Sequence, residues 1–290
     1  MVYRDVRMAF LLVIARVLCV LAIFASTGCT RLFFMPLHEL VRTPTEIGLD
    51  YEDVYFNAAD GVRLHGWWLP AEKVAQGTVV FFHGNAENIS THIGSVYWLP
   101  AAGFNVFMMD YRGYGLSDGA PSLPGIHADA IAALQTVMER TDIDTSRVVV
   151  LGQSLGAAVS IYAVAHSPYR PRFKALIVDS VFASYRQITQ EKLGALWLTW
   201  PFQWPLALTV SDDFSPAKAV ASIAPVPLLV IHGTGDQVIP IAHAHQVFAS
   251  ANEPKTLWEI PGAQHIQALR NVEIRRRLVA YLAGLLRRAE

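Results

Sequence analysis

Three residues with the chemistry of a nucleophile, a base and an acid follow glycine-rich turns in this sequence. Ser154 lies in the pattern Gly152-Gln-Ser-Leu-Gly156, between a β-branched run at 147–151 and an Ala-rich segment. A G-x-S-x-G turn between a strand and a helix holds its serine in a strained conformation with the hydroxyl exposed at the strand tip. Glycines at both flanks let the strand and the helix approach closely. The pattern predicts that Ser154 is a nucleophile.

Two later loops supply the partners that such a serine needs. Asp236 follows an apolar run in His232-Gly-Thr-Gly-Asp, and His265 follows another in Pro261-Gly-Ala-Gln-His. A carboxylate can accept the Nδ1–H of a histidine and orient it to remove the serine proton. Asp179 also follows an apolar run and is an alternative acid. Asp236 is favoured because its glycine-framed loop is typical of an exposed turn.

The turn His83-Gly84-Asn85 directly after another apolar run predicts an oxyanion hole. The backbone N–H groups of Asn85 and Leu155 are the expected donors, the latter from the first turn of the helix that follows the serine. His83 itself is expected to be structural, held by hydrogen bonds under the loop. Further along, Tyr111 and Arg112 are expected to order their own loop, with Arg112 bonding surrounding carbonyls.

The elements that would position these loops alternate along the chain. Short apolar runs of the kind found in buried parallel strands occur at 78–82, 105–109, 147–151, 175–178, 227–231 and 256–260. Helical patterns fall near 90–102, 125–140, 155–166, 242–251 and 271–288. Two alternating segments, 53–57 and 62–69, flank a turn at 59–61 and predict an antiparallel edge, with Trp67 and Trp68 in packing roles. The sequence therefore predicts an α/β fold with helices on both faces of a mostly parallel sheet, and ligand chemistry at the carboxyl ends of the strands.

The first 28 residues have the layout of a secretory signal, with basic residues before a compact apolar run and small residues after it. The ending Ser-Thr-Gly-Cys29 resembles the lipobox of bacterial lipoproteins, which implies lipidation of Cys29. An uncleaved anchor over about 8–28 is the alternative, because about 20 apolar residues can cross a bilayer. Both readings predict a membrane-held protein of the bacterial cell envelope. Thr30, where an aspartate would favour the inner membrane, favours the outer membrane.

Beyond the leader, the sequence divides into a tether at 29–52 and a catalytic domain at 53–290. The only two cysteines, Cys19 and Cys29, both precede the domain, so no disulfide is expected in it. One segment, about 182–214, breaks the alternation and contains three tryptophans between 197 and 204. It is predicted to be a small helical cap insertion. Its aromatic residues could pack on the main domain, form an acyl-binding wall over the site, or enter a lipid interface.

These motifs together resemble a known family. The region from about Val54 to Leu286 resembles the α/β-hydrolases, in the membrane-anchored serine-hydrolase branch related to bacterial lipoprotein-type hydrolases and to the α/β-hydrolase-domain depalmitoylases. The residues that carry the resemblance are His83-Gly-Asn-Ala-Glu-Asn, Asp110-Tyr-Arg-Gly-Tyr-Gly, Gly152-Gln-Ser-Leu-Gly, His232-Gly-Thr-Gly-Asp and His265. The order Ser154, Asp236, His265 is the triad order of that fold.

The expected activity is hydrolysis of a carboxylic ester or thioester through an acyl-enzyme. A prolyl-oligopeptidase-like serine peptidase and a non-catalytic envelope scaffold are the alternatives. The formal net charge of −1, with both signs dispersed, argues against a nucleic-acid partner. The expected partners are a small-molecule or lipid-like acyl ester and, through the N-terminus, a membrane. No metal and no organic cofactor is predicted, and the sequence leaves the oligomeric state open.

Overall fold

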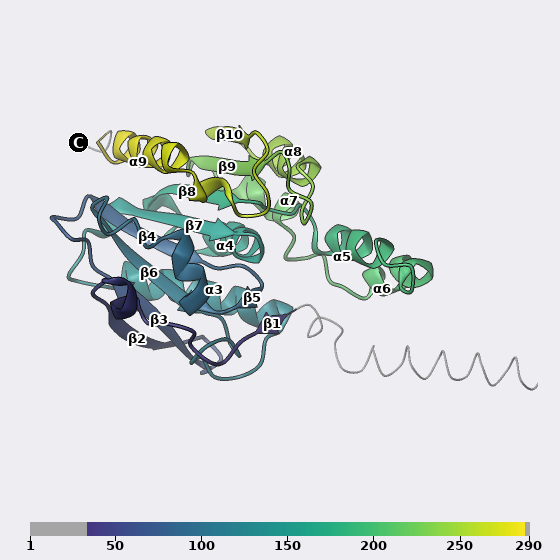
Figure 1. Cartoon of the computed structure of the whole chain (residues 1–290), viewed down its shortest axis with the longest axis horizontal. Coiled ribbons are helices and arrows are strands. Elements are labelled where there is room, and N and C mark those ends of the chain that lie inside the picture. Colours follow the sequence, from purple (N-terminus) through teal and green to yellow (C-terminus); the bar gives the residue numbers. More distant parts are fainter. Residues whose placement is uncertain (1–33, 288–290) are drawn as a thin grey trace, which may run out of the picture.

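The computed structural model describes residues 34–287, which form a twisted sheet between two layers of helices (Figure 1). The sheet has eight strands in the spatial order β10 (Lys255–Ile260), β9 (Leu228–Gly233), β8 (Phe173–Asp179), β7 (Val148–Gln153), β4 (Gly77–Phe82), β6 (Phe104–Asp110), β3 (Arg63–Leu69) and β2 (Glu52–Asn57). The strands from β10 to β6 run parallel, and β3 pairs antiparallel with both β6 and β2. The predicted α/β fold and its antiparallel edge are confirmed.

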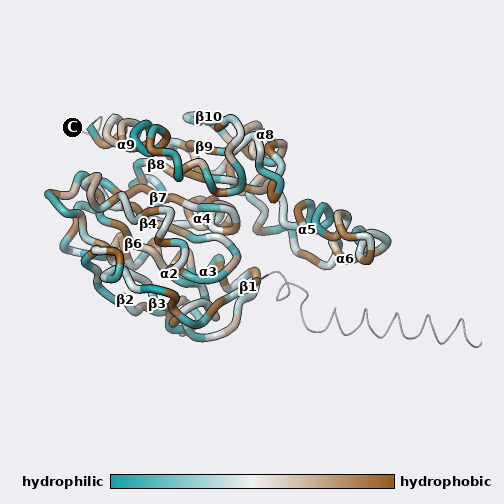
Figure 2. The backbone as a smooth tube through the Cα atoms, in the orientation of Figure 1, coloured by the Kyte–Doolittle hydropathy of each residue, from teal (hydrophilic) through white to brown (hydrophobic). Residues whose placement is uncertain are grey.

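The central strands are apolar on both faces because both faces are covered. Successive residues of β4 enter different cores: Val80 and Phe82 pack in one, and Val79 and Phe81 in the other. Figure 2 colours much of the central sheet as hydrophobic. This double burial explains why these runs lack the alternation of a half-exposed strand.

Each face of the sheet has its own helices. The first core contains residues of α3 (Leu123–Met138), α4 (Leu155–His166) and α8 (Ala242–Ser250), with the short α7 (Pro216–Ala219) and η7 (Val220–Ile223). The second core contains residues of α2 (Ile89–His92), η3 (Ile93–Ser95) and α9 (Val272–Arg287). Outside the cap, the other 3-10 turns of the described residues are η2 (Pro44–Ile47), η4 (Thr145–Arg147), η5 (Arg170–Arg172) and η8 (Ala268–Arg270).

One predicted helix is wrong. The segment 90–102 is not continuous: α2 and η3 end at Ser95, and turns follow to residue 103. Gly94 interrupts the helical pattern, and glycine is a poor helix former. The backbone hydrogen bonds after η3 mix three-residue and four-residue spacings, since both Val96 N–H and Tyr97 N–H donate to the carbonyl of Ile93.

The expected tether at 29–52 also needs correction from Phe34 onward. Strand β1 (Met35–Pro36) pairs in parallel with β5 (Ala86–Glu87), outside the main sheet. The Asn88 side chain donates to the carbonyls of Leu37 and Glu39, and Val41 N–H donates to Ser90 Oγ. These bonds hold the segment against the domain, so the folded unit begins by Phe34 and not at residue 53. The predicted signal and Cys29 lie outside the described residues.

The predicted insertion forms a helical hairpin that projects from the body (Figure 1). It consists of α5 (Tyr185–Gly194), η6 (Trp200–Phe202) and α6 (Gln203–Leu208). Ser184 caps α5 by accepting from Gln187 N–H, and Gln190 donates to Gln203 across the hairpin. Across residues 34–287, no helix is both long enough and apolar enough to span a bilayer.

Candidate active site

Ser154 occupies the sharp turn between β7 and α4. Its φ of +55° and ψ of −115° lie in a region that L-residues rarely adopt. A Cβ on Gly152 would come within 2.3 Å of the Gly156 carbonyl oxygen, and one on Gly156 within 2.1 Å of the Phe82 carbonyl oxygen. Both glycines are therefore required by close backbone approach, as the sequence pattern predicted.

The structure brings the three predicted side chains together in one chain of hydrogen bonds. His265 Nε2 lies 2.9 Å from Ser154 Oγ, and His265 Nδ1 lies 2.8 Å from Asp236 Oδ2. Because an ionised carboxylate only accepts, Nδ1 carries the proton in this arrangement, and Nε2 is left to accept from the serine hydroxyl. The His265 side chain is 18% exposed, so a substrate can reach it.

The Asp236 carboxylate is held by its own loop. The backbone N–H groups of Val238 and Ile239 donate to Oδ1 at 2.9 and 2.8 Å, which leaves Oδ2 for His265. Burial raises the pKa of Asp236, but the hydrogen bonds from His265 and from these amides outweigh it, so the pKa lies below its usual range. Asp236 is therefore an anion across the neutral pH range.

Asp179, the alternative acid, has different partners. Its Oδ2 accepts from Gln153 Nε2 at 2.8 Å, and no bond joins it to His265 in the described structure. Burial raises the pKa of Asp179 to about 6, against the lowering effect of Gln153. Its backbone matters more, because its carbonyl accepts from Ser154 N–H at 2.9 Å. The next residue, Ser180, accepts from Ile266 N–H through Oγ at 3.0 Å. The end of β8 thus supports both the serine turn and the histidine loop.

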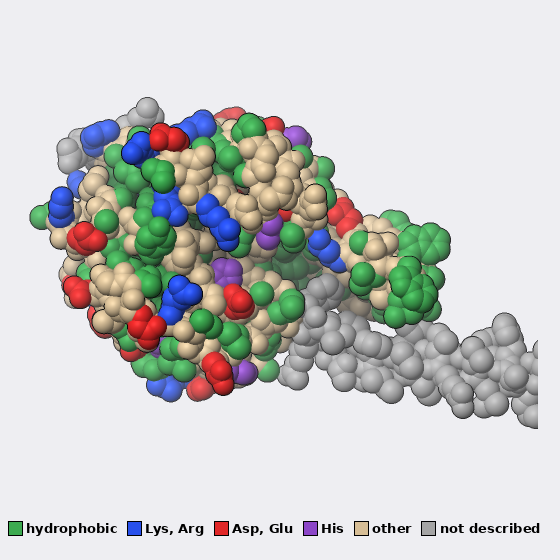
Figure 3. All heavy atoms as spheres, in the orientation of Figure 1, with side chains coloured by type: hydrophobic (Ala, Val, Ile, Leu, Met, Phe, Trp, Pro, Cys, Tyr) green, Lys and Arg blue, Asp and Glu red, His purple; other side chains and the backbone are tan. Residues whose placement is uncertain are grey.

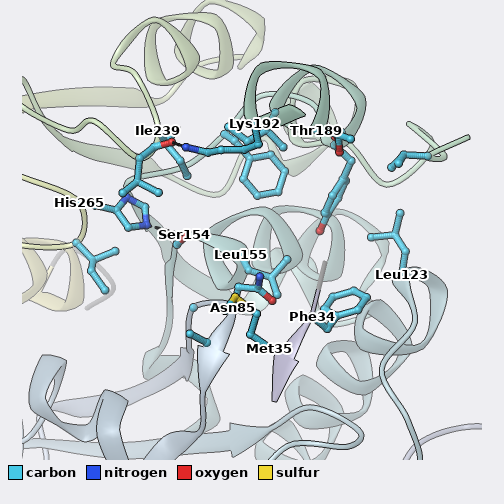
Figure 4. Close-up of a pocket in the computed structure, with 18 of the residues that line it drawn as sticks. Phe34, Met35, Asn85, Leu123, Ser154, Leu155, Thr189, Lys192, Ile239 and His265 are labelled. Carbon is cyan, nitrogen blue, oxygen red and sulfur yellow. Dashed lines mark hydrogen bonds between the residues drawn. The ribbon is translucent and has the colours of Figure 1, made fainter. Parts of the chain in front are cut away.

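The predicted oxyanion donors lie beside Ser154. Asn85 and Leu155 line the same cavity as Ser154, and Leu155 is the first residue of α4, where amides have no partner within the helix (Figure 4). The loop of Asn85 is held from the side by two tyrosines: Tyr111 donates to the His83 carbonyl at 3.1 Å, and Tyr114 to the Asn85 carbonyl at 2.8 Å. The role of Tyr114 carried no signal in the sequence beyond its place in the second glycine-rich loop.

His83 and Arg112 have structural surroundings. His83 Nδ1 lies 2.7 Å from the Gly84 carbonyl oxygen, and burial, reinforced by His92, lowers the pKa of His83 well below its usual range, so it is neutral. Arg112 contacts two carboxylates, Asp60 at 2.7 Å and Asp129 at 2.7 Å. The expectation that carbonyls would hold this guanidinium was wrong, because a buried charge is stabilised better by opposite charge.

A cavity of about 370 Å³ opens beside Ser154 and His265 (Figure 4). Its walls are largely apolar and come from the N-terminal segment, the cap and the loops after the strands. Besides the residues already named, they include Phe34, Met35, Leu123, Phe182, Tyr185, Ile188, Val210, Val238, Ile239 and Ile266. Such a cavity suits an apolar acyl group next to the serine.

Comparison with known proteins identifies the family. Residues 73–206 match the family described as serine aminopeptidase, S33. The chain is 41% identical to the protein YfhR of Escherichia coli O157:H7 over 222 residues, which cover 75% of this chain and 74% of YfhR. It is 37% identical to the α/β-hydrolase domain-containing protein WAV2 of Arabidopsis thaliana over 239 residues, which cover 77% of this chain and 75% of WAV2. The chain belongs to the α/β-hydrolase family.

A solved structure supports the same fold for this α/β-hydrolase. An esterase of Pyrococcus furiosus superposes with a TM-score of 0.69 at 20% identity, covering 88% of this chain and 98% of the esterase. At that identity the likeness concerns the fold. The resemblance to the α/β-hydrolases and the predicted fold class are both confirmed, whereas the membrane-anchored branch stays a prediction.

Several parts of this α/β-hydrolase site had no clear sequence signal. Phe34 and Met35 line the cavity because β1 pairs with β5. Each of these strands has only two residues, too few to give a strand pattern in the sequence. His92 Nε2 donates to the Ala86 carbonyl oxygen at 3.0 Å, because a carbonyl oxygen only accepts, and this bond supports the oxyanion loop. The cap enters the cavity wall through one side of α5, and the sequence did not predict which residues of the cap would line the cavity.

The tryptophans of the cap do not pack on the main domain, which was the simpler expectation for them. Trp197, Trp200 and Trp204 are 86%, 61% and 66% exposed at the far end of the hairpin. The three tryptophans do not line the cavity either, so they form no acyl-binding wall; the cap residues that line it include Tyr185, Ile188 and Val210.

Proposed function

We propose that this protein is a membrane-anchored serine hydrolase that cleaves carboxylic ester or thioester bonds through a Ser154–His265–Asp236 triad. The observation that carries the proposal is the unbroken hydrogen-bond chain from Ser154 Oγ through the His265 ring to Asp236, at 2.9 and 2.8 Å. A serine in this setting is activated by its neighbouring base.

The proposed reaction has two halves. His265 takes the Ser154 proton as Oγ attacks the acyl carbonyl, and Asp236 stabilises the imidazolium that forms. The N–H groups of Leu155 and Asn85 stabilise the oxyanion, and His265 then protonates the leaving alcohol or thiol. Water, deprotonated by His265, attacks the acyl-enzyme and releases the carboxylic acid while Ser154 recovers its proton.

The cavity favours an ester over a peptide with a free amino terminus. An aminopeptidase must hold a substrate ammonium, for which a carboxylate is the natural partner. Across the described chain no Asp or Glu lines the cavity, whereas the cationic Lys192 does. A peptidase stays the second candidate because of the family match over residues 73–206.

The proposed location is the bacterial envelope, with the domain held by a lipid on Cys29 or by an uncleaved apolar span. Its support is the composition of residues 1–29. Mass spectrometry of the purified N-terminus distinguishes the two: a diacylated Cys29 supports a lipoprotein, and an intact Met1 supports the span.

The activity is tested with p-nitrophenyl esters from acetate to palmitate and an acyl thioester, using the full chain in mild detergent. Ser154→Ala should lose at least about 10⁴-fold in kcat/KM, on the scale of triad removal. Ser222→Ala, at an exposed serine away from the cavity, is the matched control and should keep full activity.

Other outcomes assign the other functions. Turnover of aminoacyl p-nitroanilides but of no ester would make the protein a peptidase. Failure of Ser154 to react with a fluorophosphonate would leave the scaffold alternative, because an activated serine should be labelled even without a known substrate.

A further inference from the structure

The far end of the cap hairpin is an uncharged apolar surface. Its exposed apolar residues, here called the cap tip, are Leu196, Trp197, Leu198, Trp200, Phe202, Trp204 and Leu208. They make up seven of the sixteen large hydrophobic residues that are exposed in residues 34–287. From Leu193 to Ser211 the sequence has no charged residue. Figure 3 shows this patch on the projecting lobe.

The size of the cap tip sets it apart from ordinary surface. A tryptophan side chain offers about 150–250 Å² for burial, so three largely exposed indoles alone approach the roughly 300–600 Å² of the largest apolar patch on a typical monomer. Such a patch costs solubility unless something covers it. Its mixture of tryptophan and leucine is typical of side chains at the interface between water and lipid.

The cap tip is continuous with the cavity through α5. Tyr185, Ile188, Thr189 and Lys192 line the cavity, and their spacing of three and four residues places them on one side of the helix. That helix runs from the cavity wall to the cap tip. Exposed apolar residues also stand at the cavity mouth, where Met35 is 64% and Val238 45% exposed.

The described chain begins on the side of the body that carries the cap. The described chain starts at Phe34, which lines the cavity, and β1 lies on the same side of the body as the cap (Figure 1). Only residues 29–33 separate Phe34 from the apolar stretch at 8–28. At about 3.4 Å per residue, the fully extended span from Cys29 to Phe34 is at most about 17 Å. A membrane anchor in the leader would therefore keep the bilayer surface near the cavity mouth.

We propose that the cap tip inserts into the interfacial region of a lipid bilayer and so opens the cavity toward membrane lipid. An acyl chain would pass from the bilayer along α5 to Ser154, which makes a membrane-borne acyl lipid the substrate class. The insertion is argued mainly from the exposed surface itself. The choice of a bilayer as occupant also draws on the proposed anchor, and the substrate class rests on the proposed function.

A protein partner fits this surface less well. The tip is a projecting knob, whereas a stable protein interface needs about 800 Å² of shape-matched surface on each partner with a polar rim. A lipid bilayer can surround a convex apolar surface without having a complementary shape beforehand. An anchor within about 17 Å of the cavity also raises the local concentration of lipid, which favours the bilayer as occupant.

Tryptophan fluorescence tests the insertion directly. The leader at 1–33 contains no tryptophan, and of the seven in the chain Trp67, Trp68 and Trp258 are buried, with Trp98 partly buried. We would reconstitute the full chain, as Ser154→Ala, into phosphatidylcholine vesicles with brominated acyl chains, which quench only nearby indoles. Relative to unbrominated vesicles, emission should fall by up to about two fifths, the share of three tryptophans among seven.

Two sets of variants locate the effect. Trp197→Ser/Trp200→Ser/Trp204→Ser should abolish the quenching. Leu198→Asp should reduce it, because a carboxylate resists transfer into lipid. Val74→Asp is the matched control. Val74 is 94% exposed in the loop before β4, at the opposite end of that strand from the cavity. This variant should leave quenching unchanged.

Flotation of each sample shows whether the protein is on the vesicles. Protein that floats without quenching, protein that does not float, or quenching that survives the triple substitution would each overturn the proposal. Self-association through the tip would give crosslinked dimers without quenching and would overturn it too. Because the Ser154→Ala chain turns over no substrate, quenching together with an inactive wild type would refute the proposed function and leave the membrane surface standing.

Discussion

At the scale of single residues, backbone strain is concentrated around the cavity. Among residues 34–287, the non-glycine residues with positive φ are Glu87, Ser154, Ser180 and Ile266, at +66°, +55°, +58° and +50°. Ser154 and Ile266 both bond to the end of β8, which offsets the cost of these conformations. Strain of about 1–3 kcal/mol per residue persists only where the surroundings fix it. The fixed backbone is what aims the serine and the histidine at each other.

The two candidate acids are separated by matched substitutions. Asp236→Asn should lower kcat about 10⁴-fold, because an amide in place of Oδ2 no longer holds Nδ1–H and favours the wrong tautomer. Asp179→Asn should retain activity within about tenfold, since its side chain contacts Gln153 and not His265. Both are measured on the same ester; if Asp179→Asn proved the more damaging change, the acid would be misassigned.

Asp179 also predicts a dependence of stability on pH. Its folded pKa of about 6 lies above the usual 3.8, so the folded state keeps the proton longer than the unfolded chain. The contribution of this group to stability is therefore present below pH 4 and lost as pH rises to 6, by an amount on the order of 3 kcal/mol.

Urea unfolding of wild type and Asp179→Asn at pH 4 and pH 7.5 measures the contribution of Asp179 to the free energy of unfolding. The free energy of unfolding of wild type, minus that of the variant, should decrease between the two pH values. An unchanged difference would mean that Asp179 titrates normally in the fold.

The sequence predicted Ser154 and His265, because each follows an apolar strand and has glycine nearby, and it favoured Asp236 as the acid without excluding Asp179. Whether Asp179 or Asp236 faces the histidine could not be decided from the sequence, because both follow strands at the same edge of the sheet. Only the spatial course of the two loops separates them. The supporting bonds of Tyr114 and Ser180 involve backbone partners, which side-chain patterns do not reveal.

At the scale of elements, the serine turn depends on contact between α4 and β4. Gly156→Ala should destabilise the fold by about 3 kcal/mol and sharply reduce activity, because its Cβ would lie 2.1 Å from the Phe82 carbonyl and 2.5 Å from that of His83. Neither backbone atom can move without displacing the oxyanion loop.

Gly284→Ala is the matched control for that change. Gly284 lies in α9 with nothing within 4 Å of the added Cβ, so the variant should gain about 0.5–1 kcal/mol in the free energy of unfolding. Thermal unfolding and ester turnover of both variants check the pair; equal effects would show that close packing at Gly156 is unimportant.

Strands were the most predictable elements, since short, largely apolar runs fit a parallel sheet that is covered on both faces. The cap was predicted as an insertion because it broke the alternation of strands and helices. Its orientation was not predictable, because an apolar segment can equally well pack inward or stand free. In the structure Trp197 stands free, while Tyr185 of the same hairpin lines the cavity.

At the scale of the whole molecule, Arg112 connects distant parts of the chain. It follows β6 and bonds Asp129 of α3 and Asp60 of the turn between β2 and β3. Arg112→Ala should cost about 3 kcal/mol or more, because the fully buried Asp129 side chain would lose its counter-ion.

Arg276→Ala is the comparison for an exposed pair. Arg276 bonds Glu273 on the surface of α9, with both side chains more than two thirds exposed. Removing it should cost about 0.5 kcal/mol. Urea midpoints of the two variants test the contrast, and similar midpoints would argue that Asp129 is stabilised without Arg112.

The alternation of strands and helices predicted the arrangement of the domain, but it did not predict the residue at which the folded domain begins. Phe34 and the residues after it are joined to the domain mainly by bonds that involve backbone groups, such as Gly115 N–H to the carbonyl of Leu37. Hydrogen bonds between backbone groups do not depend on the type of side chain, so the sequence gives no sign of them. The segment therefore looked like a tether although it completes the cavity.

The order in which the site is assembled has a consequence for biosynthesis. The cavity takes residues from both ends of the described chain, from Phe34 to His265 and Ile266, and α9 after them contributes Leu278 and Leu282 to the second core. A chain emerging from the ribosome or crossing a membrane has its serine long before it has its histidine. The site can therefore form only after His265 and α9 have been synthesised, because until then the serine lacks its base and the second core lacks Leu278 and Leu282.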